Sequence, residues 1–259
     1  MFRGSRLSLF ALVIAAAPWN AFFCIANEQP ATRGLVLWLN ADDNSTLKIG
    51  GKGGVSRWMD KFGRGNHAHQ ADSEHKPRYE SNSLNGKPSL QFDGNDYLTL
   101  GNRESLNFSP GDPFTVVVVY HKPASGWGTF LSKGGGTSAQ RAYQFYVTRT
   151  KLGAITYGAM HESPAEDGPR VAVCVCDGRR SDVFLDGRKC LSFRAGGKSA
   201  SGKSDILIGS RRKGIDNTGT YYMYTGRIGE ILFYDRSLSE KELTVVGDCL
   251  NRKYDLHVK

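Results

Sequence analysis

Short apolar or alternating segments recur along this chain between residues such as Gly, Asn, Asp and Ser, whereas helical periodicity is nearly absent. Apolar residues at every second position are typical of strands with one buried face, and β-branched runs also favour strands. Asp186-Gly187 separates two such segments, and Asp-Gly is a strong hairpin signal because glycine accepts positive φ angles. The segments that we predict as strands are 34–39, 89–92, 97–100, 114–120, 143–147, 153–157, 170–176, 181–185, 189–193, 205–209 and 227–234.

One helix is predicted near the end of the chain. Ser239 and Glu242 form a capping box, in which the serine caps the helix and the glutamate three residues later reaches back. Apolar residues then recur at helical spacing, namely Leu243, Val246, Leu250 and Tyr254. Many short strands followed by one terminal helix indicate an all-β fold, a two-sheet antiparallel jelly-roll sandwich with one C-terminal helix.

The length of 259 residues suits one large domain. The glycine content is high, at 31 residues, and without a period, so it indicates tight turns rather than collagen. No linker divides the chain after residue 33, and no repeat of 20–50 residues is present, which disfavours a solenoid or a propeller. We therefore predict a single domain over residues 33–259.

Residues 1–26 read as a secretory signal peptide, followed by a short linker at 27–32. The segment carries Arg3 and Arg6, an apolar centre over 7–17 and the small residue Ala26 at its end. We predict cleavage after Ala26 and a secreted, periplasmic or cell-envelope protein; the alternative is an uncleaved N-terminal anchor. No later segment is long and apolar enough for a transmembrane helix.

Four cysteines follow the predicted cleavage site, namely Cys174, Cys176, Cys190 and Cys249. Four cysteines in an exported protein permit two disulfides in three pairings. Cys174 and Cys176 face the same side of one predicted strand, and Cys190 lies two strands away, beyond the Cα separation that a disulfide spans. The spacing of zinc ligands is also absent. We therefore favour buried or partly free thiols, and the pairing stays open.

Several segments of the chain together carry a resemblance to a known family. They are Gly34–Asp43, Val55–His67, Asn85–Pro88, Phe92–Gly94, Gly226–Asp235, Leu238-Ser239 and Tyr254, with the Asp-Gly hairpin after Leu185. Over residues 33–255 the chain resembles the laminin-G-like domains of the concanavalin A-like lectin/glucanase superfamily, as found on exported bacterial proteins. The resemblance implies a two-sheet jelly roll of the concanavalin A-like kind that binds glycans or proteins, although some superfamily members cleave polysaccharides.

The matched residues have structural interpretations. Trp38 and Trp58 are predicted to fill the core between the sheets, because aromatic rings bury large areas there. Glu230 is predicted to satisfy buried backbone groups or an arginine such as Arg227. The Asp93-Gly94 pair is predicted to shape a turn.

The sequence gives little support for catalysis. Glucanases of this superfamily carry Glu-x-Asp-x-x-Glu on one strand, and that pattern is absent here. Alternation places Glu230 and Asp235 on opposite faces of a strand. His161 with a tyrosine could imitate a polysaccharide lyase, but the flanking lyase motifs are missing. Glu162, Glu166 and Asp167 are predicted to lie in a solvated loop.

Aromatic residues are the predicted ligand-binding groups, because exposed rings stack on sugars. Trp127 lies between two glycines, where a bulky ring is not expected in a core. The segment Tyr221–Tyr224 places rings on both faces of a strand. The candidate ligand-binding residues are Trp127, Tyr143, Tyr157, His161 and Tyr222, with Tyr146 and Tyr221 as further candidates; core packing is the alternative for each ring.

Calcium is a further expectation from the superfamily. Asp42 and Asp43 follow one predicted strand, and Asp93 and Asp96 lie in one predicted turn. Carboxylates are the hard oxygen ligands that calcium prefers, but these four lack the spacing of an EF-hand loop. Only the fold could bring them together as a calcium site, and turn capping is the alternative.

The charge of the chain bears on its partners. The formal net charge is +9, and loss of residues 1–26 leaves 32 basic and 25 acidic residues. Export argues against nucleic acid as a partner, whereas an anionic polysaccharide fits a basic protein. We predict an exported non-catalytic carbohydrate- or surface-binding module for a glycan or cell-surface polymer. The alternatives are a polysaccharide-cleaving enzyme and a protein-binding adhesion domain, and the oligomeric state stays open.

Overall fold

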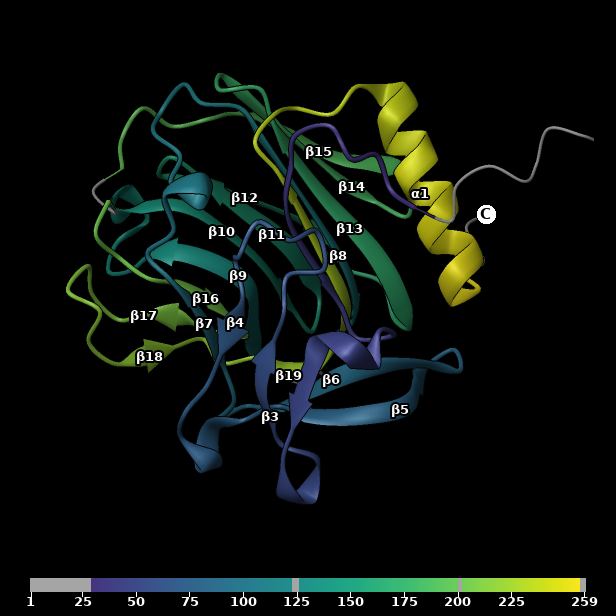
Figure 1. Ribbon diagram of the computed structural model, residues 1–259. Coiled ribbons are helices and arrows are strands. Elements are labelled where there is room, and N and C mark those ends of the chain that lie inside the picture. The colour runs from purple at the N-terminus through teal and green to yellow at the C-terminus, as the bar shows by residue number, and fades with distance from the viewer. Residues whose placement is uncertain (1–28, 123–125, 200–201, 257–259) are drawn as a thin grey trace, which may run out of the picture.

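The computed structural model describes residues 29–122, 126–199 and 202–256, so the predicted signal peptide lies outside the described residues. Within these ranges the strands form two large antiparallel sheets and a small ribbon (Figure 1), and the predicted sandwich is confirmed. The first sheet has the order β15 (Arg188–Arg194), β14 (Arg180–Leu185), β13 (Pro169–Cys176), β8 (Phe114–His121), β19 (Thr225–Tyr234), β6 (Lys87–Asp93) and β5 (Arg78–Leu84), with β1 (Leu35–Asn40) also paired to β19.

The second sheet faces the first. Its order is β12 (Ala159–Pro164), β11 (Lys151–Thr156), β10 (Arg141–Thr148), β9 (Trp127–Gly134), β16 (Ile206–Ile208), β7 (Leu98–Gly101), β4 (Ala68–His69), β3 (Val55–Trp58) and β2 (Leu47–Ile49). The ribbon joins β17 (Arg211–Arg212) to β18 (Thr220–Tyr221) beside β9. Short 3-10 turns lie at η2 (Asn44–Thr46), η3 (Gly51–Gly53), η4 (Ser73–His75), η5 (Glu104–Leu106) and η6 (Ser138–Gln140).

The predicted strands are present, but two details of their pairing differ from a simple meander. Residues 93–96 do not close a hairpin, because β6 belongs to the first sheet and β7 to the second, so the turn crosses the sandwich. The segment around Glu162 is the strand β12 rather than a solvated loop. By contrast, β13, β14 and β15 form the predicted meander, with Asp186 and Gly187 at φ +49° and +79° in its hairpin.

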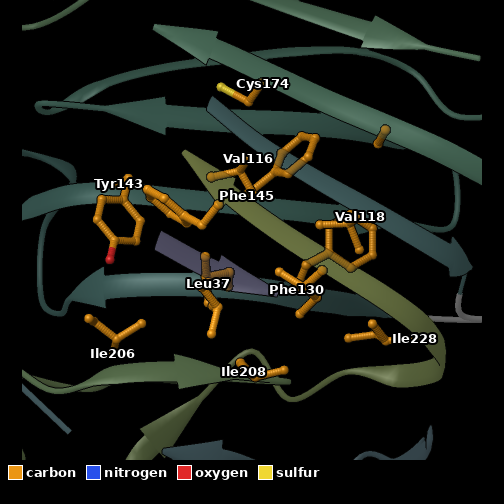
Figure 2. Close-up of a cluster of buried hydrophobic side chains, with 14 of the residues drawn as sticks. Leu37, Val116, Val118, Phe130, Tyr143, Phe145, Cys174, Ile206, Ile208 and Ile228 are labelled. Atoms are coloured by element: carbon orange, nitrogen blue, oxygen red, sulfur yellow. The ribbon is translucent and has the colours of Figure 1, made fainter. Parts of the chain in front are cut away.

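Apolar side chains from both sheets interlock between them. Figure 2 shows part of this inter-sheet core, in which Leu37, Val116 and Val118 of the first sheet face Phe130 and Phe145 of the second. Trp58 belongs to the same core and is fully buried, as predicted. Burial of the apolar surface of these side chains supplies the main driving force for folding of such a domain.

The first sheet is buried on its other face as well. Along β8, Val117 and Val119 point away from the inter-sheet core and form a second cluster with residues of α1 (Glu240–Tyr254). The helix lies along β13 on the outside of the sandwich (Figure 1). Trp38 belongs to this second cluster, so the prediction that it packs between the sheets is wrong. A strand that is buried on both faces explains the continuous apolar run of 114–120.

The helix begins as the sequence predicts. The Ser239 hydroxyl accepts a hydrogen bond from the Glu242 backbone N–H, and the Glu242 carboxylate accepts one from the Ser239 backbone N–H. Val246, Leu250 and Tyr254 are buried against the first sheet, and Leu243 is partly buried there. Arg236 also pairs with Glu242 and, together with the capping hydrogen bonds, lowers the pKa of that carboxyl to about 2. No helix of the described residues has the length and the apolar composition that a membrane crossing requires.

Glu230 is buried beneath the helix, at 1% exposure. Its carboxylate accepts hydrogen bonds from Trp38 Nε1 at 2.6 Å, Lys253 Nζ at 2.7 Å and the Tyr254 hydroxyl at 3.0 Å. The predicted arginine partner is wrong, since Arg227 pairs with Glu80 instead. Glu230 therefore links a central strand to the end of the helix.

Candidate functional site

Four aromatic rings and two arginines gather where the ribbon meets the outer face of the second sheet. We call them the aromatic–arginine site: Trp127, Tyr146, Tyr221, Tyr222, Arg141 and Arg211. The Trp127 ring stacks on Tyr146 at 5.2 Å between centroids and lies 5.1 Å from Tyr222, which contacts Tyr221 at 4.3 Å. Trp127 and Tyr221 are 39% and 48% exposed, so these two rings are open to a ligand, whereas Tyr146 is buried.

Successive side chains along β9 and β10 point to opposite faces of the second sheet, and this alternation produces the arrangement. Phe130 and Phe145 belong to the inter-sheet core, so Trp127 and Tyr146 point to the opposite face of the second sheet. The carbonyl of Tyr222 accepts a hydrogen bond from the backbone N–H of Thr129 at 3.2 Å, which fixes the ribbon segment against β9. Rings from segments far apart in the sequence thereby come into contact.

The two arginines are buried without an acidic partner. Arg141 and Arg211 are only 7% and 5% exposed, and neither forms an ion pair with any residue that the structure describes. Both guanidinium groups donate to the carbonyl of Gly136, at 2.6 Å from Arg141 and 3.4 Å from Arg211. Within the described chain, Nε of each arginine has no hydrogen-bond partner. The site therefore holds two positive charges that no carboxylate among the described residues pairs with.

Burial and mutual repulsion disfavour these charges. Desolvation, followed by repulsion from Arg211, lowers the pKa of Arg141 to about 10. Burial also lowers the pKa of Arg211, which a hydrogen bond from its side chain to Tyr222 partly offsets. Both groups remain charged at neutral pH. The Arg211 guanidinium lies 4.6 Å above the Tyr222 ring, a cation–π geometry that partly stabilises the charge.

Glycines bring the two arginines together. A side chain on Gly135 would overlap the backbone carbonyls of Arg212 and Gly214, so the turn before β10 and the loop after β17 approach at backbone contact. The Gly136 N–H donates to the Lys213 carbonyl at 2.7 Å across this contact. Only a residue without a Cβ permits this approach.

The Tyr146 ring rests on Gly153 of the neighbouring strand, and its hydroxyl donates to Glu162 at 2.8 Å. Burial raises the pKa of Tyr146 well above its usual range, so this tyrosine stays protonated and acts as a donor. Tyr146 is therefore not prepared to act as a base at neutral pH.

We expect Gly153→Ala to disturb the ring stack, because the added methyl would overlap the Tyr146 ring. Displacement of Tyr146 should change the surroundings of Trp127 and hence its fluorescence emission. The matched control is Gly247→Ala on the helix, where the new methyl meets no atom within 4 Å and alanine favours the helix. An unchanged Trp127 emission in Gly153→Ala would contradict the stacking argument.

Three of the predicted ligand-binding residues do not join this site. Tyr143 and Tyr157 are buried in the inter-sheet core (Figure 2 shows Tyr143 there), and their hydroxyls donate to the carbonyls of Leu106 and Asp112. These two predictions are wrong, because both rings are enclosed between the sheets. His161 is exposed, but it stacks on Phe193 at 4.4 Å, on the opposite face of β12 from Glu162. Trp127 and Tyr222 are the predicted residues that the structure brings together.

The predicted calcium ligands remain two separate pairs. A carboxylate oxygen of Asp42 lies 3.5 Å from Nζ of Lys87, and one of Asp43 lies 2.8 Å from Nζ of Lys61. Lysines therefore supply the counter-charges of both aspartates. Asp93 and Asp96 lie in the turn after β6. The part of the chain that the structure describes holds no group of three or more His, Cys, Asp or Glu side chains that could bind a metal ion. The fold therefore does not assemble the four aspartates into one site.

Asp96 is a buried carboxyl, at 5% exposure, whose Oδ2 accepts a hydrogen bond from the Asp93 N–H at 3.0 Å. Burial raises its pKa from 3.8 to about 7. Because the folded value lies above the unfolded one, this carboxyl should destabilise the fold progressively as the pH rises from 3.8 through about 7.

Asp96→Asn should remove this pH dependence, since the amide oxygen can accept the same hydrogen bond and carries no charge. We expect the variant to melt at a higher temperature than the unsubstituted protein. This difference in melting temperature should be larger at about pH 8 than at about pH 5, two values that lie on either side of the raised pKa. Asp216→Asn, at a fully exposed carboxyl, is the control. Equal differences at the two pH values would contradict the buried-carboxyl interpretation.

The roles of Arg141 and Arg211 were not predicted. Arg211 begins the short basic run 211–213, which gives no sign of its separate role, since Arg212 pairs with Asp205 at 2.8 Å in the structure. The available signal was the glycine run at 134–136 directly before β10, which indicates a close backbone approach. Cys174 and Cys176 lie buried in the inter-sheet core, away from this site.

Comparison with known proteins supports the architecture. No protein-family model and no curated protein matches the sequence. Among solved structures, the chain is similar to the binding domain of Paraclostridial Mosquitocidal Protein 1, with a TM-score of 0.58 and 13% identity over 84% of this chain and 52% of that one. It is also similar to Trypanosoma rangeli sialidase in complex with sialic acid, with a TM-score of 0.58 and 17% identity over 86% of this chain and 34% of that one.

A third similar structure is the Ruminococcus gnavus IT-sialidase CBM40 bound to α2,6 sialyllactose, with a TM-score of 0.50 and 17% identity over 61% of this chain and 96% of that one. The chain spans about half the length of the mosquitocidal binding domain and about a third of the sialidase. At these identities the likenesses show the fold alone. The chain therefore has a β-sandwich fold similar to that of these three structures.

Proposed function

We propose that this chain is a carbohydrate-binding module that recognises an acidic glycan through the aromatic–arginine site. The observation that carries the proposal is the pair of buried guanidinium groups, Arg141 and Arg211, without an acidic partner in the described chain and beside partly exposed rings. A sugar carboxylate would supply the missing negative charge.

The energetics favour such a ligand. Two buried charges of the same sign lose hydration and repel each other, so they destabilise the free protein. An anion bound between them would make charge-assisted hydrogen bonds to groups that are already fixed in place. The exposed faces of Trp127 and Tyr221 would stack on the apolar face of the sugar ring. The two guanidinium groups would then select the acidic sugar of the glycan, and the exposed aromatic rings would add affinity.

The similar structures agree with this ligand class. The CBM40 domain is described with sialyllactose and the sialidase with sialic acid, both of which carry a carboxylate. Since identity to both is low, the support extends to carboxylated sugars as a class and not to a particular glycan.

We further propose that the domain is laminin-G-like and that it is exported after cleavage following Ala26. The sequence segments that resemble that family support the first part of this proposal, and the apolar segment after Arg6 supports the second. N-terminal sequencing of the protein recovered outside the cytoplasm would test the cleavage site. An N-terminus at Met1 would contradict it.

A glycan array tests the function directly. The array should carry sialylated, uronate-containing and sulfated glycans, each beside its neutral counterpart, such as 3′-sialyllactose beside lactose. We expect binding to at least one acidic glycan and a preference of about tenfold or more over its neutral counterpart, because one charge-assisted contact contributes about 1.5–3 kcal/mol. Equal binding to the members of every pair, or binding to no acidic glycan, would overturn the proposal.

The same glycans separate binding from cleavage. A module that only binds should leave them intact, whereas a polysaccharide-cleaving enzyme would release new reducing ends. Release of reducing ends from any glycan on the array would replace the proposed function with that alternative.

A further inference from the structure

A polar pocket of about 770 Å³ lies between η3, η4 and the strands β5 and β6. We call it the polar pocket. It differs from the aromatic–arginine site in that no aromatic ring lines it. A glycine loop lines one side of the pocket, and charged side chains, among them Lys76, Arg78 and Asp93, line the rest.

Alternation explains why these polar side chains share one surface. Leu90 and Phe92 point into the inter-sheet core, so Gln91 and Asp93 face outward on β6. Arg78 is the cross-strand partner of Gln91 on β5 and also bridges to Gly54. The glycine loop thereby forms one wall over the outward face of the strands.

Most charged groups of the pocket are not paired with one another. Glu80 bonds to Arg227, which lies outside the lining. The other charged groups of the lining form no ion pair in the part of the chain that the structure describes. They are Lys52, Lys76, Arg78, Glu74, Asp93 and Asp96. The pocket therefore presents charged groups that no ion pair within the described residues occupies.

The charges of the pocket nearly balance. Three cations face four acids, one of which is neutralised by Arg227, and burial raises the pKa of Asp96 to about 7. An ionic ligand would leave an excess charge in this lining, whereas a neutral ligand with many hydroxyls would not. Hydroxyls can donate to carboxylates, and they can accept from lysine and arginine.

We propose that the polar pocket is a second saccharide site, which takes a neutral sugar. The proposal deepens the proposed function, since it would make the module bivalent, but it depends on different residues. Without a stacking ring we expect weak affinity for a single sugar, with a Kd on the order of millimolar. Two weak sites on one polymer would bind it more tightly together than either alone.

Two-dimensional ¹H–¹⁵N NMR tests the proposal on the full mature chain. The probes are glucose, galactose, mannose and N-acetylglucosamine, each added to about 100 mM, which is enough to approach saturation at a millimolar Kd. We expect at least one of them to shift the amide signals of Gly51, Gly54 and Gly94 saturably while the Trp127 indole signal stays in place. No saturable shift at these glycines with any probe would overturn the proposal.

Asp93→Asn is the matching variant, because the Asp93 side chain accepts a hydrogen bond from the Asn95 N–H that an amide oxygen can replace. It should weaken sugar binding about fivefold or more, as expected for the loss of a charged hydrogen-bond acceptor. Asp216→Asn is the control, since Asp216 accepts the same type of bond from Thr218 in an exposed turn. Lys76→Gln gives an independent second test. Unchanged affinity in both Asp93→Asn and Lys76→Gln would also overturn the proposal.

The two sites can fail separately. Loss of acidic-glycan binding with intact shifts at Gly51 would refute the proposed function alone. Acidic-glycan binding without saturable shifts at Gly51, Gly54 and Gly94 would refute the second site alone.

Discussion

The double variant Arg141→Gln/Arg211→Gln is expected to bind an acidic glycan about 100-fold more weakly than the unsubstituted protein. Each guanidinium would lose a charge-assisted bond worth about 1.5–3 kcal/mol, and two such losses reach or exceed that factor. Isothermal titration with 3′-sialyllactose, or with the acidic glycan that the array selects, measures the change.

The same variant should not lose stability. The arginines are buried, repel each other and have no acidic partner in the described chain, so their removal relieves a cost of the folded state. We expect an unchanged or higher melting temperature together with weaker binding. Such a combination is typical of binding sites, where function and stability oppose each other.

Arg179→Gln/Arg180→Gln is the matched control, because both side chains are exposed in a basic turn of the first sheet. It removes the same net charge and should change the affinity by less than about twofold, as solvent-exposed charges contribute little. Equal effects of the two double variants would mean that net charge, and not the buried pair, binds the glycan.

Glu230→Ala is expected to lower the free energy of unfolding by about 3–5 kcal/mol, the usual cost of leaving a buried charge without its partner. Lys253, the Trp38 indole N–H and the Tyr254 hydroxyl would lose their shared acceptor. In a domain of this size the melting temperature should fall by roughly 10 °C. Thermal unfolding followed by circular dichroism measures the shift.

Glu80→Ala is the comparison, since Glu80 also pairs with a basic residue but lies partly exposed, with 32% of its side chain accessible. Solvent screening limits the contribution of such a pair to about 1 kcal/mol or less. If both variants lost the same stability, Glu230 would not be the buried link between β19 and the helix that its contacts indicate.

The sequence predicted the fold well because local signals and tertiary structure agree. Alternating segments became strands, the Asp186-Gly187 turn became a hairpin, and the Ser239 capping box started the helix. The sequence did not distinguish the two faces of the first sheet. Trp38 was assigned to the wrong core because a continuous apolar run shows that both faces are buried but not what covers each of them.

The candidate site was predicted less well. Trp127 was found because its glycine neighbours argue against a core position, whereas Tyr143 and Tyr157 share the aromatic character of a binding residue and lie in the core. Arg141 and Arg211 are 70 residues apart, and only the contact between two loops brings them to the Gly136 carbonyl. The glycine run at 134–136 indicates a close backbone approach, but no local pattern shows which segment makes it.

The position of β19 in the first sheet has a consequence for how the chain folds. This strand pairs with β8, β6 and β1, which come from much earlier parts of the sequence. The centre of the first sheet thus cannot close until β19 has been synthesised, and contacts between such distant segments form slowly. Until then, the apolar edges of β8 and β6 lack the neighbour that joins them.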